Sequence, residues 1–217
     1  MRLYLASTSP ARLTLLRAAG VDPVTIPSNV DEPVAVAAAE AEHGPLRTAA
    51  VVQLLAQAKA EAVAGVHTDG EPIDGLILGG DSAFELDGVT YGKPHEPEVA
   101  RERWLMQRGR TGLLHSGHWL IDHRGGRAGA SVGGVATASV TFADDITDDE
   151  IDAYVASGEP LKVAGAFTID SLGGPFITRV DGDPSTVVGL SLSTLRRLVR
   201  QLGVEWTELW NMGRNAV

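Results

Sequence analysis

The sequence contains no cysteine, has only 5% aromatic residues, and lacks any apolar run approaching the roughly 20 residues that span a bilayer. The absence of cysteine excludes disulfides, cysteine nucleophiles and thiolate zinc sites, and it fits a reducing compartment. The N-terminal segment MRLYLASTSPARL has one early cation and too short an apolar run for a signal peptide. We therefore expect a cytoplasmic protein without a membrane partner.

Positive charge is also scarce in this chain. It has 18 Lys and Arg residues against 28 Asp and Glu residues, a formal net charge of −10. Duplex nucleic acids are bound by broad basic surfaces, so a nucleic-acid polymer is not an expected partner. A small anionic ligand would need a few local cations, or a metal ion, set against this acidic background.

Strands and helices alternate along the whole chain. Strands are expected at residues 2–6, 24–27, 75–84, 113–123 and 135–142. Helices are expected from Pro10 to about Gly20 and at residues 36–42, 45–66, 97–108, 148–157 and 191–202. No repeat or linker divides the chain, so the sequence predicts one α/β domain with a mixed sheet over residues 1–217.

The turn after the first predicted strand reads Ser7-x-Ser9-Pro10-x-Arg12. Ser9 is a favourable helix N-cap and Pro10 a favourable first helical residue. Backbone N–H groups at a helix N-terminus, two hydroxyls and a guanidinium together would form an anion site. A capped surface helix without a ligand is the alternative interpretation.

Acidic residues occur at two candidate positions. Asp81 follows Gly79 and Gly80 near the end of an apolar strand, where a carboxylate is costly unless it is paired or binds a cation. The glycines would let a ligand approach the backbone closely. Asp31 and Glu32 are adjacent acids in a predicted loop. The alternatives are a turn aspartate that accepts local amides and loop acids that are simply solvated.

Two lysines are candidates for a site cation. Lys59 falls beside the apolar stripe of the predicted helix at 45–66, from which it can snorkel to solvent or point into a cleft. Lys93 lies in a rigid Gly-Lys-Pro loop, and either lysine alone more often faces solvent. The pair His115-x-x-His118 lies on a predicted strand, where residues three apart face opposite ways, which argues against a metal clamp.

Seven segments together resemble the Maf (septum formation) family of nucleotide pyrophosphatases over nearly the whole chain. They are LASTSPARLTLLRAAG at 5–20, VDEP at 30–33, LAQAKAEAVA at 55–64, LGGDS at 78–82, YGKP at 91–94, EIDAYVASGEPLKVAGAF at 150–167 and VVGLSLSTLRRL at 187–198. Each segment alone is a weak signal, whereas their order and spacing are highly specific.

The resemblance implies a Maf/ITPase-like α/β fold, with a mixed, elongated sheet split into two lobes around a deep cleft. It also implies a cytoplasmic, homodimeric hydrolase that uses Mg²⁺ or Mn²⁺. This enzyme would convert nucleoside triphosphates to the monophosphate and pyrophosphate, as in the house-cleaning of modified nucleotides. A nucleotide-binding regulator of septum formation with little catalysis is the alternative, and a plain phosphatase is a third hypothesis.

The same resemblance suggests roles for individual residues. Asp81 would be the general base or a metal-linked acid, with Lys59 and Lys93 as catalytic cations. We expect Asp31 and Asp81, together with Glu32, to hold the metal ion. The residues predicted to bind substrate are Ser7, Ser9, Arg12, Glu32 and Asp170.

The sequence departs from the family pattern at two informative positions. Ala11 precedes Arg12 where paired arginines are usual, so one phosphate contact is missing or replaced. Asp170 stands where many bacterial members carry glutamine, and a branch resembling members that act on 7-methyl-GTP has an acid there. The base preference therefore stays open, while the reaction type depends on other residues.

Overall fold

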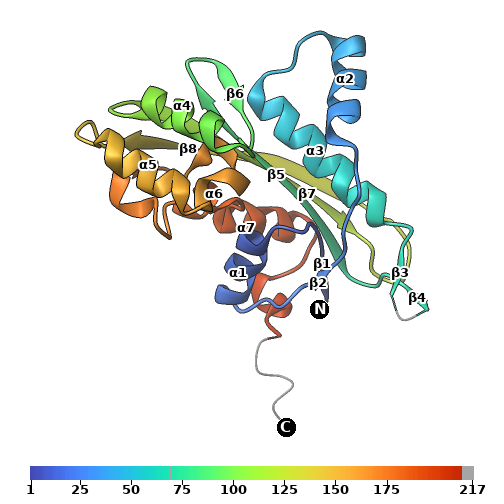
Figure 1. Cartoon of the computed structure of the whole chain (residues 1–217). Coiled ribbons are helices and arrows are strands. Elements are labelled where there is room, and N and C mark those ends of the chain that lie inside the picture. The colour runs from blue at the N-terminus through green and yellow to red at the C-terminus, as the bar shows by residue number, and fades with distance from the viewer. Residues whose placement is uncertain (69, 212–217) are drawn as a thin grey trace.

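A mixed sheet forms the centre of the computed structural model, which describes residues 1–68 and 70–211 (Figure 1). Its seven strands are β1 (Leu3–Ala6), β2 (Val24–Thr25), β5 (Leu76–Leu86), β6 (Val89–Tyr91), β7 (Thr111–Asp122), β8 (Ser131–Phe142) and β9 (Ile177–Asp181). The order is β2-β1-β5-β7-β8-β9, with β6 also paired to β5. Strand β1 runs parallel to β2 and β5, and the other pairs are antiparallel. The predicted mixed sheet is confirmed.

The other elements surround this sheet. The α-helices are α1 (Pro10–Ala18), α2 (Glu32–His43), α3 (Thr48–Val63), α4 (Pro97–Gln107), α5 (Asp148–Ala156), α6 (Pro184–Val188) and α7 (Leu192–Gln201). Short 3-10 helices are η1 (Glu159–Lys162), η2 (Ala164–Ala166), η3 (Gly174–Phe176) and η4 (Trp206–Leu209), and β3 (His67–Thr68) pairs with β4 (Glu71–Pro72). Among the described residues, no helix has the length and apolar character needed to cross a membrane.

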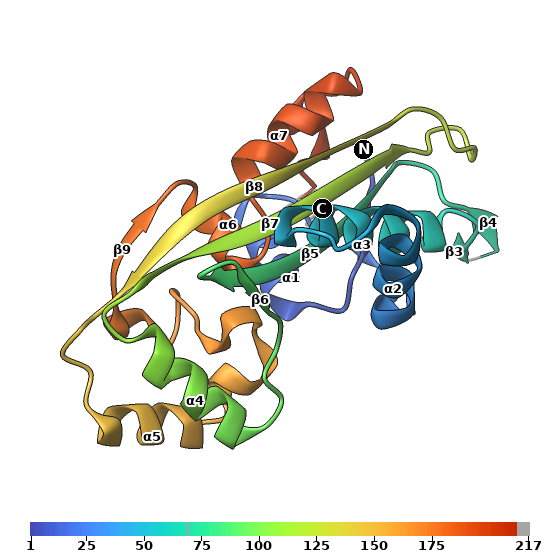
Figure 2. The ribbon, with the colours of Figure 1, turned by 90° about the horizontal axis from the view of Figure 1, so that it is seen from above.

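Separate hydrophobic cores lie at the two ends of the elongated sheet. One packs β1 and β5 against α1 and α7 and includes Leu78 and Leu195. The other packs β5 and β8 against α4 and α5, where the Trp104 and Phe142 rings meet edge to face. Figure 2 shows α4 and α5 well away from α7, in agreement with the predicted two-lobed arrangement. Strand β5 gives Leu78 to the first core and Phe84 to the second, so the residues between them lie between the lobes.

Several local sequence signals form the expected structures. Ser9 caps α1 by accepting from Arg12 N, with Pro10 as the first helical residue. Thr147 forms a capping box with Glu150 at the start of α5. The β5–β6 turn at Asp87 and Gly88 has positive φ at both residues, as tight hairpins require.

Two predicted boundaries are wrong. The helix expected at 36–42 begins at Glu32, because Asp31 serves as its N-cap and Pro33 is tolerated in a first turn. The acidic segment is therefore a helix start rather than a loop. Strand β8 begins at Ser131, inside the glycine-rich stretch expected to be a loop, because Val132 to Gly134 pair with β7. The predicted domain extent of 1–217 includes residue 69 and residues 212–217, which lie outside the described residues.

Candidate functional site

Helix α3 lies unusually close to the sheet because two glycines face it. A Cβ atom added at Gly79 of β5 would lie 2.0 Å from Ala56 O, and one at Gly117 of β7 would lie 2.2 Å from Val52 O. Only glycine permits backbone atoms to approach in this way. The contact fixes α3 over β5 and places Lys59, almost one turn after Ala56, above this part of the strand.

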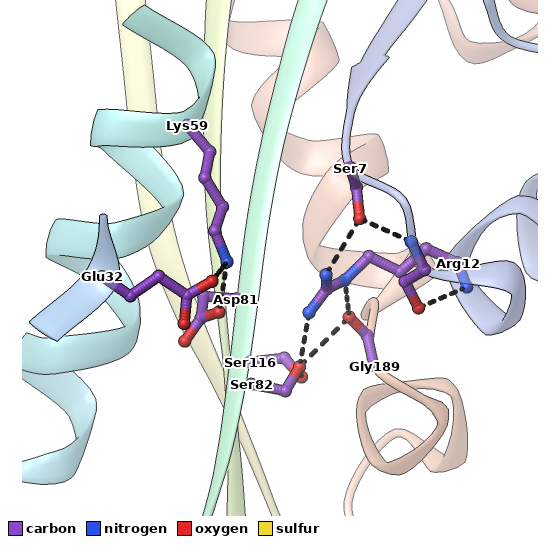
Figure 3. Close-up of polar contacts among 9 residues, drawn as sticks. Ser7, Arg12, Glu32, Lys59, Asp81, Ser82, Ser116 and Gly189 are labelled. Atoms are coloured by element: carbon purple, nitrogen blue, oxygen red, sulfur yellow. Dashed lines mark hydrogen bonds and ion pairs between the residues drawn. The ribbon is translucent and has the colours of Figure 1, made fainter. Parts of the chain in front are cut away.

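Lys59 joins two carboxylates at this position (Figure 3). Its Nζ lies 2.7 Å from Asp81 Oδ1 on β5 and 2.7 Å from Glu32 Oε1 at the start of α2. The Lys59 side chain is only 10% exposed, whereas the Glu32 side chain is 48% exposed. Burial raises the pKa of Asp81, although the charges of Lys59 and Arg12 act in the opposite direction. The site therefore holds a largely buried carboxylate with a stronger tendency to take a proton than an ordinary aspartate.

Arg12 occupies the opposite face of β5. Successive strand residues point to opposite faces, so Gly79 and Asp81 face α3 while Gly80 and Ser82 face Arg12. Arg12 Nε donates to Gly189 O at 2.8 Å, and its terminal nitrogens donate to Ser7 Oγ at 3.2 Å and Ser82 Oγ at 3.1 Å. Figure 3 shows this hydrogen-bond network on one side of the strand and the Lys59 ion pairs on the other.

The guanidinium of Arg12 is buried without a carboxylate in contact. Its hydrogen-bond partners within the described residues are one carbonyl and two hydroxyls. Burial lowers the pKa of Arg12, while Asp81 and Glu32 raise it from a distance. A buried cation that lacks a touching counter-charge is costly, and a bound anion would offset that cost.

The two faces meet at an open edge of β5. Strand β1 pairs with β5 only as far as Ala6 and Gly79, and β6 begins its pairing at Phe84. Within the described chain no strand pairs with Gly80 to Ala83 along this edge. The Ser7–Arg12 turn follows β1 directly, so it lies where an extended anion could contact both faces. Ligands in open α/β sheets commonly bind at such strand ends.

A cavity of about 200 Å³ lies beside this turn. Its lining comprises Ser7, Thr8, Ser9, Pro10, Leu13, Thr25 and Pro27. This lining combines hydroxyls with apolar side chains, which would suit a ligand of mixed polarity.

The remaining predicted site residues are placed less centrally. Ser9 caps α1, and Asp31 caps α2 by accepting from Val34 N at 3.1 Å. Lys93 and Asp170 are exposed, and no hydrogen bond or ion pair within the described chain joins either of them to Lys59 or Asp81. The described residues also include no group of three or more His, Cys, Asp or Glu side chains suited to hold a metal ion.

Three members of the Arg12 network, Ser82, Ser116 and Gly189, were not predicted from the sequence. Ser82 Oγ lies 2.8 Å from Ser116 Oγ and 3.3 Å from Gly189 O, and Ser116 in turn donates to Thr186 O. Strand alternation would have placed Ser82 opposite Asp81. No local signal identifies Ser116 or Gly189, because their roles depend on contacts over 34 and 107 residues.

One family model and several named relatives match nearly the whole chain. The family described as "Maf-like protein" matches residues 2–202. The nucleoside triphosphate pyrophosphatase of Leifsonia xyli subsp. xyli is 77% identical, covering 97% of each chain. That of Salinispora tropica is 48% identical, covering 98% of this chain and 89% of the relative. The solved Staphylococcus aureus Ham1 protein is 14% identical, with TM-score 0.47 over 93% of this chain and 100% of that chain, and it carries no functional weight.

Proposed function

Because the chain belongs to the Maf-like protein family, we propose that it hydrolyses nucleoside triphosphates to the monophosphate and pyrophosphate. Relatives carrying the name of this activity match the chain almost from end to end. The observation that carries the proposal is that a largely buried base candidate, Asp81, and a buried cation, Arg12, lie on opposite faces of β5 beside an edge that no described strand covers.

Arg12 and the α1 N-terminus would bind the polyphosphate. A planar guanidinium suits phosphate oxygens, and a helix N-terminus adds backbone N–H groups and a favourable dipole. Three hydrogen bonds to neutral groups hold Arg12 in a fixed orientation. Because none of these partners is a carboxylate, the positive charge is free to attract a phosphate, which supports this role. Ser7 and Ser9 would complete this end of the site, and Ala11 leaves it with one arginine.

Asp81 would act as the general base. A water oxygen would form a bond to the α-phosphorus of the nucleotide while one proton of that water passes to an Asp81 carboxylate oxygen. The bond between the α-phosphorus and the α–β bridging oxygen breaks, and its electron pair leaves with the pyrophosphate group. Arg12 and Lys59 would offset the charge that accumulates during this step. The raised pKa of Asp81 supports the assignment, because a base is most effective when its pKa lies near the working pH.

We further propose that the reaction depends on Mg²⁺ or Mn²⁺. The carboxylates of Glu32 and Asp81 converge on one ammonium, and Mg²⁺ is commonly held by one or two carboxylates together with substrate phosphates. What supports Glu32 over Asp31 as the second ligand is that Asp31 already caps α2. A bound divalent ion would neutralise phosphate charge and make a water more acidic.

The remaining assignments extend this proposal. Lys93 would contact the departing pyrophosphate, and Asp170 would contact the base of the nucleotide. The loop that carries Lys93 is tied to η2 by a hydrogen bond from Gly165 N to Gly92 O at 3.3 Å, which supports a fixed position for it. A cytoplasmic homodimer and a role in removing modified nucleotides rest on the family resemblance.

Product identification tests the proposal. The purified chain is incubated with a panel of canonical and methylated nucleoside triphosphates, with Mg²⁺, with Mn²⁺ and with a chelator. We expect equal amounts of monophosphate and pyrophosphate, formed only with a divalent ion. Orthophosphate with a nucleoside diphosphate would identify a phosphatase instead. Tight binding without any product would identify a nucleotide-binding protein.

A further inference from the structure

His118 is a fully buried histidine on β7, the strand that pairs with β5 along the edge opposite to the open one. It pairs with Gly80 of β5 and is 0% exposed. Its Nε2 accepts a hydrogen bond from Ser191 N at 2.9 Å, and its Nδ1 lies 3.3 Å from Gly134 O. A backbone nitrogen can only donate, so Nε2 must carry no proton, and the proton of the neutral ring resides on Nδ1.

Ser191 is close in sequence to Gly189, whose carbonyl contacts Arg12. Ser191 is the N-cap of α7 and stands two residues after Gly189, whose carbonyl accepts from Arg12 Nε at 2.8 Å. Leu190 N donates to Ser185 O at 3.1 Å, which holds the Gly189–Leu190 peptide on the α6 side. The segment from Gly189 to Ser191 is short, so the position of Ser191 sets the carbonyl direction from the other side. The side chain of Ser191 donates to Asp183 at 2.7 Å, while its backbone N–H depends on His118.

We propose that His118 is a positioning residue for Arg12, because its unprotonated Nε2 fixes the Ser191 backbone and thereby directs the Gly189 carbonyl at the guanidinium. This inference rests on the proposed function, in which Arg12 binds substrate phosphate. The imidazole must stay neutral for two reasons. A protonated ring would lose its acceptor, and it would also place a second positive charge near Arg12.

Charged groups from two directions act on His118. Burial lowers the pKa of His118 to about 4, although the hydrogen bond to Gly134 O opposes this shift. The positive charge of Arg12 on α1 also lowers the pKa, and the negative charge of Asp183, the N-cap of α6, raises it. The ring is therefore neutral through the range in which the enzyme would be assayed. His115, three residues earlier, provides a matched comparison, because it is also buried but contacts Thr137 Oγ1 at 3.0 Å instead of the Arg12 network.

Steady-state kinetics of four variants test the inference. His118→Leu removes the acceptor and should raise KM for the triphosphate about tenfold, with a smaller change in kcat, since one hydrogen bond is lost near a bound anion. His118→Gln should restore most of the parent KM, because its amide oxygen can accept at the same place. His115→Leu should leave KM within about twofold. In an Arg12→Lys background, His118→Leu should have little further effect on KM.

A measurement without turnover separates this inference from the proposed function. In the parent protein, ¹⁵N NMR should show His118 protonated at Nδ1 and not at Nε2. Hydrogen exchange at Arg12 Nε should become about tenfold faster in His118→Leu, and unchanged exchange would overturn the inference. An unchanged KM in His118→Leu, or failure of His118→Gln to rescue a raised KM, would also overturn it. Should the parent release no pyrophosphate while the NMR results hold, the proposed function fails and the positioning contact stands.

Discussion

The Lys59 ammonium lies 2.7 Å from the Asp81 carboxylate, and it reaches that carboxylate from a helix that glycines hold against the sheet. The same nitrogen contacts Glu32, so a single cation is shared between two acids. The arrangement balances burial of Asp81 against a nearby positive charge. Burial raises the pKa of Asp81 and Lys59 lowers it, and the net direction is upward. Reactivity at this site should therefore respond to changes on α3 as well as on β5.

Removing the Lys59 charge should change both the rate and its pH dependence. Lys59→Met should reduce kcat about 100- to 1000-fold, the usual cost of losing a charge that stabilises a transition state. Because Lys59 lowers the pKa of Asp81, its removal should raise that pKa further. The acidic limb of the profile of kcat/KM against pH should therefore move to higher pH. A limb that stays in place or moves to lower pH would contradict the assignment of Asp81 as the base.

Adding one methyl group at Gly79 should disrupt the packing of α3. In Gly79→Ala the new Cβ would lie 2.0 Å from Ala56 O, so the helix or strand must shift. We expect a loss of about 1–3 kcal/mol in the free energy of unfolding, measured by urea denaturation. Gly65→Ala is the matched control, since its Cβ would meet nothing within 4 Å. Equal stability of the two variants would show that α3 does not depend on this contact.

Arg12 should not be replaceable by lysine. Arg12→Lys keeps the charge but cannot reproduce contacts with Gly189, Ser7 and Ser82 from one planar group. KM for the triphosphate should rise about 10- to 100-fold, as expected when charged hydrogen bonds are lost. Arg17→Lys, on the same helix but in an exposed pair with Asp22, should leave KM unchanged. A parent-like KM in Arg12→Lys would remove Arg12 from the phosphate site.

Glu159 should stabilise the segment that carries Asp170. Its carboxylate accepts hydrogen bonds from Tyr154, Thr168, Ser171, Leu172 and Gly173. Desolvation raises the pKa of Glu159, but the hydrogen bonds outweigh it and hold the pKa at about 2, against 4.5 for an ordinary glutamate. We expect Glu159→Gln to lower the free energy of unfolding at pH 7 by about 1–3 kcal/mol.

The pH dependence of this loss follows from the sign of the shift. A depressed native pKa stabilises the fold fully above pH 4.5, and that contribution disappears as the pH falls toward 2. The difference between parent and Glu159→Gln, followed by urea denaturation, should therefore shrink over this interval. Glu102→Gln, at an exposed position of α4, is the control. A difference that grows as the pH falls would contradict the account.

Local chemistry explains why much of the fold could be predicted. Ser9 and Pro10 at the start of α1, Asp87 and Gly88 in the hairpin, and Thr147 before α5 each act through neighbours within four residues. Their preferences are properties of short segments, so the sequence shows them directly. The apolar runs around β5 and β7 similarly identified the central strands.

Contacts between distant residues explain what could not be predicted. Glu32 was expected in a loop, and its pairing with Lys59 depends on where α3 packs. Gly189 lies 177 residues from Arg12, and nothing local marks its carbonyl as a partner. The prediction that His115 and His118 lie on one strand and face opposite ways is confirmed. The hydrogen bond from Ser191 N to His118 could not be predicted, because it depends on how α7 packs against β7.

Turnover by Asp81→Asn tests the central claim most directly. The amide keeps the size of the side chain but cannot accept the water proton, so the proposed base is removed with little change in shape. Pyrophosphate release from a saturating nucleoside triphosphate should fall by about 100- to 10,000-fold, while circular dichroism and the urea midpoint show a folded protein. Release at a rate close to that of the parent would contradict the account, because the buried carboxylate would then have no part in the chemistry.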